Sequence, residues 1–201
     1  MPLGAPLPQA SAAMILLHGR GATAANILGL AGQIGQPEIA YLAPQAAGNT
    51  WYPYSFLAPL EENEPGLSSA LRVIADLLEE IGNHQLPPEK TVLAGFSQGA
   101  CLALEFAARN PGRYGAVIGL SGGLIGPPGT RRDYSGSLDD TPVFLGCGDQ
   151  DAHIPLERVE ETSRLFHGLH AQVTQRIYPG MGHAINEDEL DFVRQLLNSL
   201  V

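Results

Sequence analysis

Short runs of consecutive apolar residues alternate with amphipathic segments along most of the chain. The runs predict buried strands, because a strand covered on both faces has no polar side. They lie at Ala13–Leu17, Ile39–Leu42, Thr91–Ala94, Tyr114–Leu120, Pro142–Cys147 and Val173–Tyr178. Apolar positions at helical spacing predict helices between these strands. The helices are expected at Ala24–Ile34, Ser68–Ile81, Gln98–Arg109, Leu156–Leu169 and Glu187–Leu200.

This alternation of strands and helices predicts an α/β fold, a compact and mostly parallel sheet with helices on both faces. Right-handed crossovers bring the carboxyl ends of the strands to one edge, where open α/β sheets bind ligands. The length suits one domain, 1–201, in which residues 1–12 are an N-terminal tail or an edge segment. The irregular stretch 44–66 is long for a loop in a compact domain, and such loops are usually functional.

The charge balance narrows the range of partners. The chain has 21 acidic and 11 basic residues, a formal net charge of −10. An acidic surface repels phosphate backbones and anionic headgroups, so neither nucleic acid nor stable membrane insertion is expected. The apolar stretch Ala12–Leu17 is too short for a signal peptide, and no basic residue precedes it, which predicts a cytoplasmic protein. Cys101 and Cys147 lie in apolar runs and are expected to be buried free thiols.

A serine lies between two glycines where a strand is expected to turn into a helix. Residues 95–99 read Gly-Phe-Ser-Gln-Gly, directly after the strand Thr91–Ala94. This is the G-x-S-x-G pattern in the strand-to-helix context that a nucleophilic serine requires. The sharp reversal strains the serine backbone, and the flanking glycines have no Cβ to clash across the turn. The pattern predicts Ser97 as a nucleophile.

A serine hydroxyl needs a base to take its proton, and histidine suits this role near neutral pH. His183 follows the sixth predicted strand in a glycine-rich loop that can approach the sheet edge closely. Three other histidines, His84, His167 and His170, lie on or beside helices among polar residues and are expected at the surface. His183 is therefore the candidate base.

The loop after the fifth predicted strand offers two aspartates to orient the histidine. Asp151 lies deeper in the loop and has the longer reach, which favours it, and Asp149 is the alternative. An aspartate at the position of Asp149 often braces a turn instead. The resulting chain order of Ser, Asp and His is the order found in α/β-hydrolases.

Two backbone N–H groups are the candidates for an oxyanion hole. Gln98 follows the nucleophile, and Arg20 lies in the glycine-rich turn after the first strand. For the Arg20 side chain we expect a salt bridge to an acidic neighbour, and a carboxylate on the substrate is the alternative.

Together these motifs resemble the phospholipase/carboxylesterase family of α/β-hydrolases, which includes the acyl-protein thioesterases. The resemblance rests on His18-Gly19-x-Gly21, Trp51, Gly95-Phe96-Ser97-Gln98-Gly99, Gly148-Asp149-x-Asp151-x-x-Ile154-Pro155 and Gly182-His183. The segment His-Gly-Arg-Gly-Ala from residue 18 is similar to a bacterial branch of this family. The resemblance implies a triad of Ser97, Asp151 and His183, oxyanion donors at Arg20 and Gln98, and a sheet without a cap domain.

The predicted function is that of a carboxylesterase acting on small or medium acyl esters through an acyl-enzyme, with no metal or organic cofactor. Candidate substrate-binding residues are Trp51, Tyr52, Phe56, His153 and Met181. An acyl thioesterase or a dienelactone-hydrolase-like enzyme is the alternative, and a non-catalytic receptor on the same fold is a further one. The partner is a small-molecule ester, and assembly into a homodimer stays open.

Overall fold

A parallel sheet forms the centre of the computed structural model, which describes residues 4–201. The strand order is β2-β1-β3-β4-β5-β6, and every neighbouring pair is parallel. The strands are β1 (Ala12–Leu17), β2 (Ile39–Leu42), β3 (Thr91–Phe96), β4 (Ala116–Leu120), β5 (Pro142–Gly148) and β6 (Gln172–Tyr178). The predicted α/β class is therefore confirmed, and the sheet is entirely parallel.

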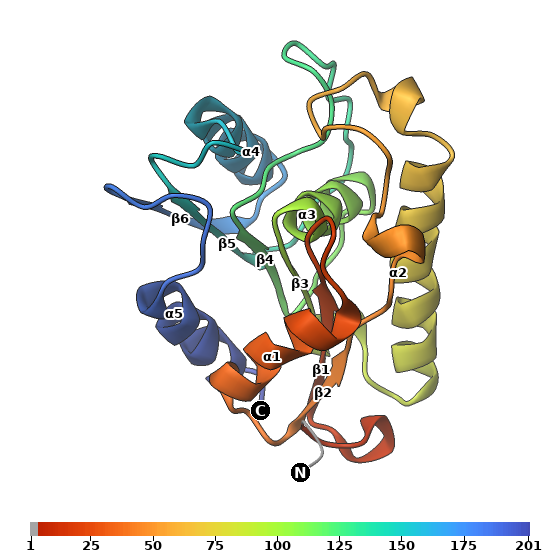
Figure 1. The fold of residues 1–201 in the computed structure, drawn as a ribbon. Helices are drawn as coiled ribbons and strands as arrows, with labels where there is room; N and C mark the ends of the chain where they lie inside the picture. The colour runs from red at the N-terminus through yellow and green to blue at the C-terminus, as the bar shows by residue number, and fades with distance from the viewer. Residues whose placement is uncertain (1–3) are drawn as a thin grey trace.

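Within residues 4–201, five α-helices cover the two faces of this sheet. They are α1 (Ala24–Ile34), α2 (Gly66–Asn83), α3 (Gln98–Arg109), α4 (Leu156–Gly168) and α5 (Glu187–Asn198). Figure 1 shows α1 and α5 on one face and α2, α3 and α4 on the other. None of these helices within residues 4–201 combines the length and the apolar character needed to cross a bilayer.

Alternating side chains of β1 show why its sequence is apolar throughout. Ala13, Ile15 and Leu17 pack into the core beneath α2, α3 and α4. Met14 and Leu16 pack into the opposite core beneath α1 and α5. Because both faces of the strand are covered, each position buries an apolar side chain, as expected for a parallel sheet.

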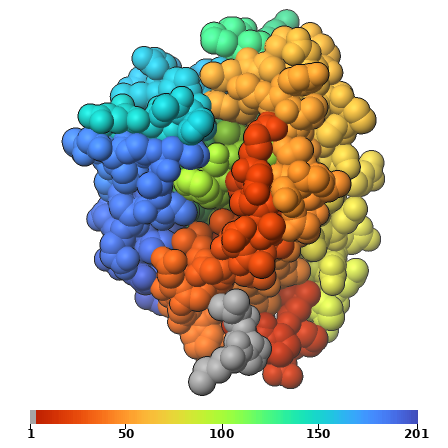
Figure 2. Space-filling view, in the orientation of Figure 1, coloured from red at the N-terminus to blue at the C-terminus, as the bar shows by residue number. Residues whose placement is uncertain are grey.

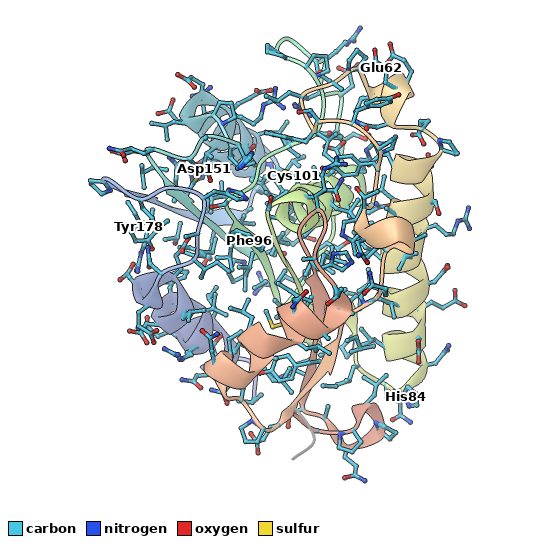
Figure 3. All side chains as sticks on the ribbon, viewed as in Figure 1. Glu62, His84, Phe96, Cys101, Asp151 and Tyr178 are labelled. Atoms are coloured by element: carbon cyan, nitrogen blue, oxygen red, sulfur yellow. The ribbon has the colours of Figure 1, made fainter. Side chains whose placement is uncertain are left out.

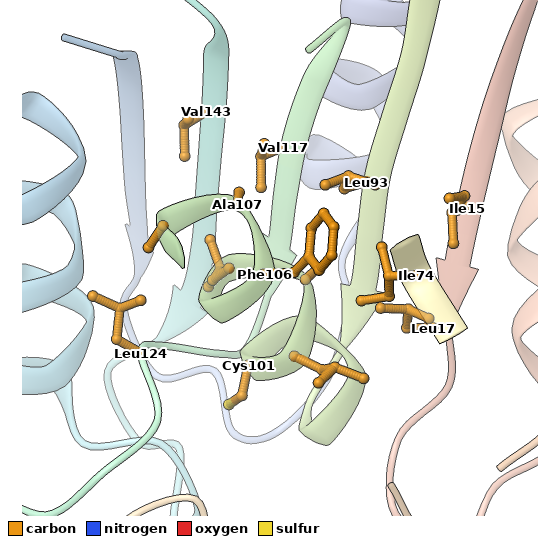
Figure 4. Packing of buried hydrophobic residues seen from close by; sticks show 14 of the residues in the cluster. Ile15, Leu17, Ile74, Leu93, Cys101, Phe106, Ala107, Val117, Leu124 and Val143 are labelled. Carbon is orange, nitrogen blue, oxygen red and sulfur yellow. The ribbon is translucent and has the colours of Figure 1, made fainter. Parts of the chain in front are cut away.

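The core on the α3 face contains side chains from the sheet, from α3 and from α2. Phe106 of α3 lies between Leu93 of β3 and Val117 of β4, with Ile74 of α2 at the side (Figure 4). All four side chains are nearly or fully buried. Burial of apolar surface at about 25 cal/mol per Å² makes such contacts the main stabilising term. This packing holds α3 against the sheet.

The strand order creates a switch point between β1 and β3. The chain leaves β1 toward β2 on one side and returns to β3 on the other. The loops that follow β1 and β3 therefore diverge, which opens a crevice at the carboxyl edge of an open sheet. Ser97 and the segment around Arg20 lie at these two strand ends.

The segment before β1 runs along the edge strand β2. Gly4 forms an antiparallel bridge with Ala40, and the Ala5 N–H donates to the Ile39 carbonyl at 3.0 Å. A short 3₁₀ turn, Leu7–Gln9, then leads into β1. Residues 1–3 of the predicted tail lie outside the described residues.

Candidate active site

Ser97 occupies a strained turn between β3 and α3. Its φ is 55° and its ψ is −120°, a conformation that residues other than glycine rarely adopt. A Cβ on Gly95 would lie 2.3 Å from the carbonyl carbon of Gly99, and a Cβ on Gly99 would lie 2.1 Å from the Leu17 oxygen. Both positions of the pattern therefore require glycine. Such a backbone stores about 1–3 kcal/mol, which the surrounding packing must hold in place.

A short hydrogen bond joins His183 to Asp151. The distance from Nδ1 of His183 to Oδ2 of Asp151 is 2.7 Å, and the aspartate side chain is fully buried. The other carboxylate oxygen accepts from the N–H of His153 at 2.8 Å and of Ile154 at 3.1 Å. Burial alone would raise the pKa of Asp151, but the bonds from His183 and the two N–H groups lower it below its ordinary value.

The state of Asp151 determines which nitrogen of His183 is free. An ionised carboxylate only accepts hydrogen bonds, so Nδ1 of His183 carries the proton. Nε2 of the neutral ring is then left as the acceptor, which is the state that a general base needs.

Asp149 braces the loop that carries the histidine. Its Oδ1 accepts from the Gly180 N–H at 2.7 Å. A Cβ on Gly148 would lie 1.9 Å from the Met181 oxygen, so the 180–183 loop rests directly on the end of β5. Of the two aspartates that the sequence left open, the structure pairs Asp151 with His183 and gives Asp149 the bracing position.

Ser97 and His183 line one cavity of about 670 Å³. Figure 2 shows a hollow between the blue C-terminal segments and the red segment near residue 20, with orange segments above it. Phe96 and His153 flank the His183 ring, with ring centroids at 4.8 and 4.7 Å. No hydrogen bond joins Ser97 to His183 within the described part of the chain.

The predicted site residues fall into two groups. Tyr52, Phe56 and His153 line the cavity, whereas Trp51 and Met181 are not among its lining side chains. The Trp51 indole donates to the His18 carbonyl at 2.8 Å and packs on the His18 ring, which keeps it in the core. Figure 3 shows Phe96, Cys101 and Asp151 near the same end of the sheet, while His84 lies at the far end of α2.

Two backbone N–H groups are free to stabilise an oxyanion. Those of Arg20 and Gln98 have no acceptor among residues 4–201, and both residues line the cavity. A Cβ on Gly19 would lie 3.4 Å from the Ser97 Cβ, so the loop after β1 runs beside the serine. Gln98 is also the first residue of α3, where the positive end of the helix dipole favours negative charge.

The Arg20 side chain corrects an expectation from the sequence. It forms no salt bridge within the described residues and binds the loop after β2 instead. One terminal nitrogen donates to Thr50 Oγ1 at 2.9 Å and to the Pro53 carbonyl at 2.8 Å. The other donates to the carbonyls of Tyr52, at 3.0 Å, and Tyr54. The loop presents its carbonyl oxygens to one guanidinium, which satisfies the charge without a carboxylate.

The Gln98 side chain binds the same loop, a role that the sequence analysis missed. Its Oε1 accepts from the Trp51 N–H at 3.0 Å, and its Nε2 donates to the Tyr52 carbonyl at 2.9 Å. The side chain is almost fully buried. Both candidate oxyanion residues therefore hold the 50–54 loop through their side chains and leave their backbone N–H groups free.

Glu189 is a second residue that sequence reasoning missed. It lies in the first turn of α5, where its Oε2 accepts from the Asn186 N–H at 2.8 Å in a capping box. Its Oε1 is buried without a partner and packs against Gly146 of β5. Burial raises the pKa of this carboxyl to about 7, even though the bond from Asn186 opposes the shift. The capping-box pattern of Asn186 and Glu189 is the sequence signal that could have pointed to this residue.

The chain is similar to proteins of a known family. A profile of the phospholipase/carboxylesterase family matches residues 4–201. Acyl-protein thioesterase 1 of Gibberella zeae is 32% identical over 139 residues, which cover 68% of this chain and 59% of that protein. The match thus spans under two thirds of the length of that curated relative.

Two solved structures are similar over nearly the whole chain. A phospholipase/carboxylesterase from Dyadobacter fermentans has a TM-score of 0.92 and 43% identity, covering 98% of this chain and 93% of that one. The esterase PE8 has a TM-score of 0.79 and 28% identity, covering 96% of this chain and 94% of that one.

Removing the Arg20 guanidinium should loosen the 50–54 loop. In Arg20→Met the four hydrogen bonds to the loop are lost. We expect amide hydrogen exchange in residues 50–54 to speed up by about ten-fold or more, since each bond contributes roughly 1 kcal/mol. Arg131→Met is the matched control, because Arg131 is exposed and pairs with the exposed Asp133. Equal exchange in the two variants would contradict this role.

Replacing Glu189 should change how stability depends on pH. The folded-state pKa of about 7 exceeds the ordinary 4.5, so the stability it contributes is present at low pH and is lost as pH rises through about 7. Glu189→Gln cannot ionise, so its free energy of unfolding relative to the wild type should rise between pH 5 and 8. We expect a gain on the order of 1–3 kcal/mol in urea titrations.

Exposed Glu62 supplies the control for this measurement. Glu62→Gln should show no such trend between pH 5 and 8. If the two variants behave alike, the neutral form of Glu189 is not favoured by its burial.

Proposed function

The chain belongs to the phospholipase/carboxylesterase family, and from this premise we propose that it is a serine carboxylesterase. Ser97 attacks the carbonyl of a small or medium acyl ester and forms an acyl-enzyme. The observation that carries this proposal is the hydrogen bond of 2.7 Å between Asp151 and His183, because His183 lines the same cavity as Ser97.

The path of the proton follows from the tautomer of His183, in which Nδ1 carries the proton and Nε2 is free. Nε2 of His183 takes the proton of the Ser97 hydroxyl as the serine oxygen bonds to the ester carbon. The same proton then passes to the departing alcohol. In the second half of the reaction, Nε2 of His183 takes a proton from the water that attacks the acyl-enzyme. This proton then passes to the Ser97 oxygen as the acid leaves. Asp151 stabilises the imidazolium that forms at each step, in line with its lowered pKa.

The N–H groups of Arg20 and Gln98 supply the oxyanion hole in this proposal. Each is unpaired in the described structure and belongs to a residue whose side chain is held by the 50–54 loop. Donors that are already oriented need no reorganisation when charge develops on the carbonyl oxygen. One such donor is typically worth about 2.7–4 kcal/mol in the transition state.

The cavity favours a neutral, partly apolar substrate. Tyr52, Phe56 and Ile154 contribute to its wall. The Arg20 guanidinium already donates to the Thr50 hydroxyl and to carbonyl oxygens of the 50–54 loop. We therefore propose a small-molecule ester without a carboxylate near the reacting carbon. We also propose that residues 1–201 form a single domain and that the protein is cytoplasmic.

An acyl thioesterase is the second candidate. The 32% identity to acyl-protein thioesterase 1 of Gibberella zeae favours it. The same serine attack and acyl-enzyme apply to a thioester, whose thiolate leaves more readily. A series of p-nitrophenyl esters measured beside acyl-CoA thioesters separates the two activities by their kcat/KM values.

Loss of the Ser97 hydroxyl should abolish turnover. We expect Ser97→Ala to lower kcat on p-nitrophenyl acetate by about 10⁶-fold, the typical effect of removing a triad serine. A fluorophosphonate probe should label the wild type and not this variant. Ser69→Ala, an exposed serine of α2, is the control and should keep both properties. Turnover that survives in Ser97→Ala would remove Ser97 from the reaction.

Replacing each of the two aspartates after β5 should have very different effects on kcat. Asp151→Asn cannot hold His183 in the required tautomer, and kcat should fall by about 10⁴-fold. Asp149→Asn keeps an oxygen that can accept from Gly180, so its kcat should stay within about ten-fold of the wild type. Steady-state kinetics on p-nitrophenyl acetate compares the pair. The reverse order of effects would exchange their roles.

A further inference from the structure

A second hollow lies next to the catalytic cavity. Its volume is about 260 Å³, and Gly19, Ala22 and Phe96 line both hollows. Phe96 directly precedes Ser97, and Gly19 runs beside the serine Cβ. The two hollows are therefore neighbours that share lining residues next to the reacting serine.

One face of α1 and the loop after His183 form the walls of this groove. Ile27 and Leu30, one turn apart on α1, are buried beneath it. Ile185, two residues after the histidine, lies on the facing wall. With Phe96, these three side chains make the groove largely apolar, which favours an apolar occupant such as an alkyl chain over a polar one.

The groove offers no charged side chain to a ligand. His18 is its one ionisable lining residue, and both nitrogens of that ring already have backbone partners. Nδ1 lies 2.8 Å from the Gly19 oxygen, and Nε2 accepts from the Ala46 N–H at 3.2 Å. The polar residues Asn26 and Gln33 are exposed, at the rim.

We propose that this groove is a subsite for an aliphatic arm of the ester substrate, an inference that rests on the proposed function. The reacting carbon of an ester carries two organic arms that diverge from it, the acyl chain and the alcohol. The aromatic cavity accommodates one arm and the α1 groove the other, because the two hollows share Gly19, Ala22 and Phe96 as lining residues and Phe96 directly precedes Ser97. At about 30 Å³ for each water-sized group, the groove has room for roughly eight such groups.

Gly29 provides a clean test of this subsite. It lines the groove on α1, and a Cβ placed there would meet no atom within 4 Å. A larger side chain would therefore fill the groove without displacing the core. Replacing a glycine inside a helix also stabilises the helix, by about 0.5–1 kcal/mol for alanine. Gly82 of α2 is exposed with equal free space and is distant from both hollows, which makes it the matched control.

The experiment compares Gly29→Leu and Gly82→Leu on two ester series. Alkyl acetates from ethyl to hexyl vary the alcohol, and methyl esters from acetate to octanoate vary the acyl chain. Acid release gives kcat/KM, corrected for competent sites by fluorophosphonate titration. In Gly29→Leu we expect the ratio of kcat/KM for the longest to the shortest ester to fall by about ten-fold or more in one series, since even one methylene is worth that much in an apolar pocket.

Each outcome has a defined meaning. A fall in the alkyl acetate series assigns the groove to the alcohol arm, and a fall in the methyl ester series assigns it to the acyl arm. Unchanged ratios in both series, or an equal fall in Gly82→Leu, would overturn the subsite.

Gln33→Trp, which narrows the exposed rim, is a second variant in case Gly29→Leu unfolds. Gln33→Trp should also lower the ratio of kcat/KM for the longest to the shortest ester. An unchanged ratio in this variant would contradict the proposed subsite. Failure of the proposed function is a separate result, because it would appear as turnover that persists in Ser97→Ala.

Discussion

The hydrogen bond between His183 and Asp151 is the contact on which the arrangement of the site depends. It joins the loops after β5 and β6, whose strands pair along their full length. Gly148 lets the 180–183 loop approach the end of β5, and Asp149 holds it there through Gly180. Without these contacts the imidazole would sample other orientations, and the tautomer that leaves Nε2 free would not be favoured.

A second set of contacts organises the opposite side of Ser97. The side chains of Arg20 and Gln98 both bind the Tyr52 carbonyl, and each leaves its own N–H unpaired. The loop after β2 is thus coupled to the loop after β1 and to the first turn of α3. This coupling explains how a long segment with little regular structure can form a defined cavity wall, because its carbonyl groups find partners that helices or strands would otherwise supply.

The limits of prediction follow from the range over which each interaction acts. Apolar runs and glycine positions are local signals, so the helix bounds of α1 and α3, the strand β2 and the turn at Ser97 could be predicted closely. The partners of the Arg20 side chain could not, because three of the four are backbone carbonyls more than 30 residues away, which leave no pattern in the sequence. The same holds for Trp51, an aromatic residue of the predicted functional loop that packs on His18 in the core.

In the proposed esterase, the arginines near the cavity already have partners, which leaves little charge to attract an anionic substrate. Arg158, whose guanidinium carbon is 5.8 Å from the Phe56 ring centroid, donates to the carbonyls of Leu124 and Gly126 and pairs with Glu161. Arg20 is satisfied by the 50–54 loop in a similar way. An anionic substrate would have to displace these bonds and would gain little attraction at a net charge of −10. Discrimination in such a site must therefore come from the shape and apolar area of its two hollows, a source of selectivity worth about 1–3 kcal/mol per methylene.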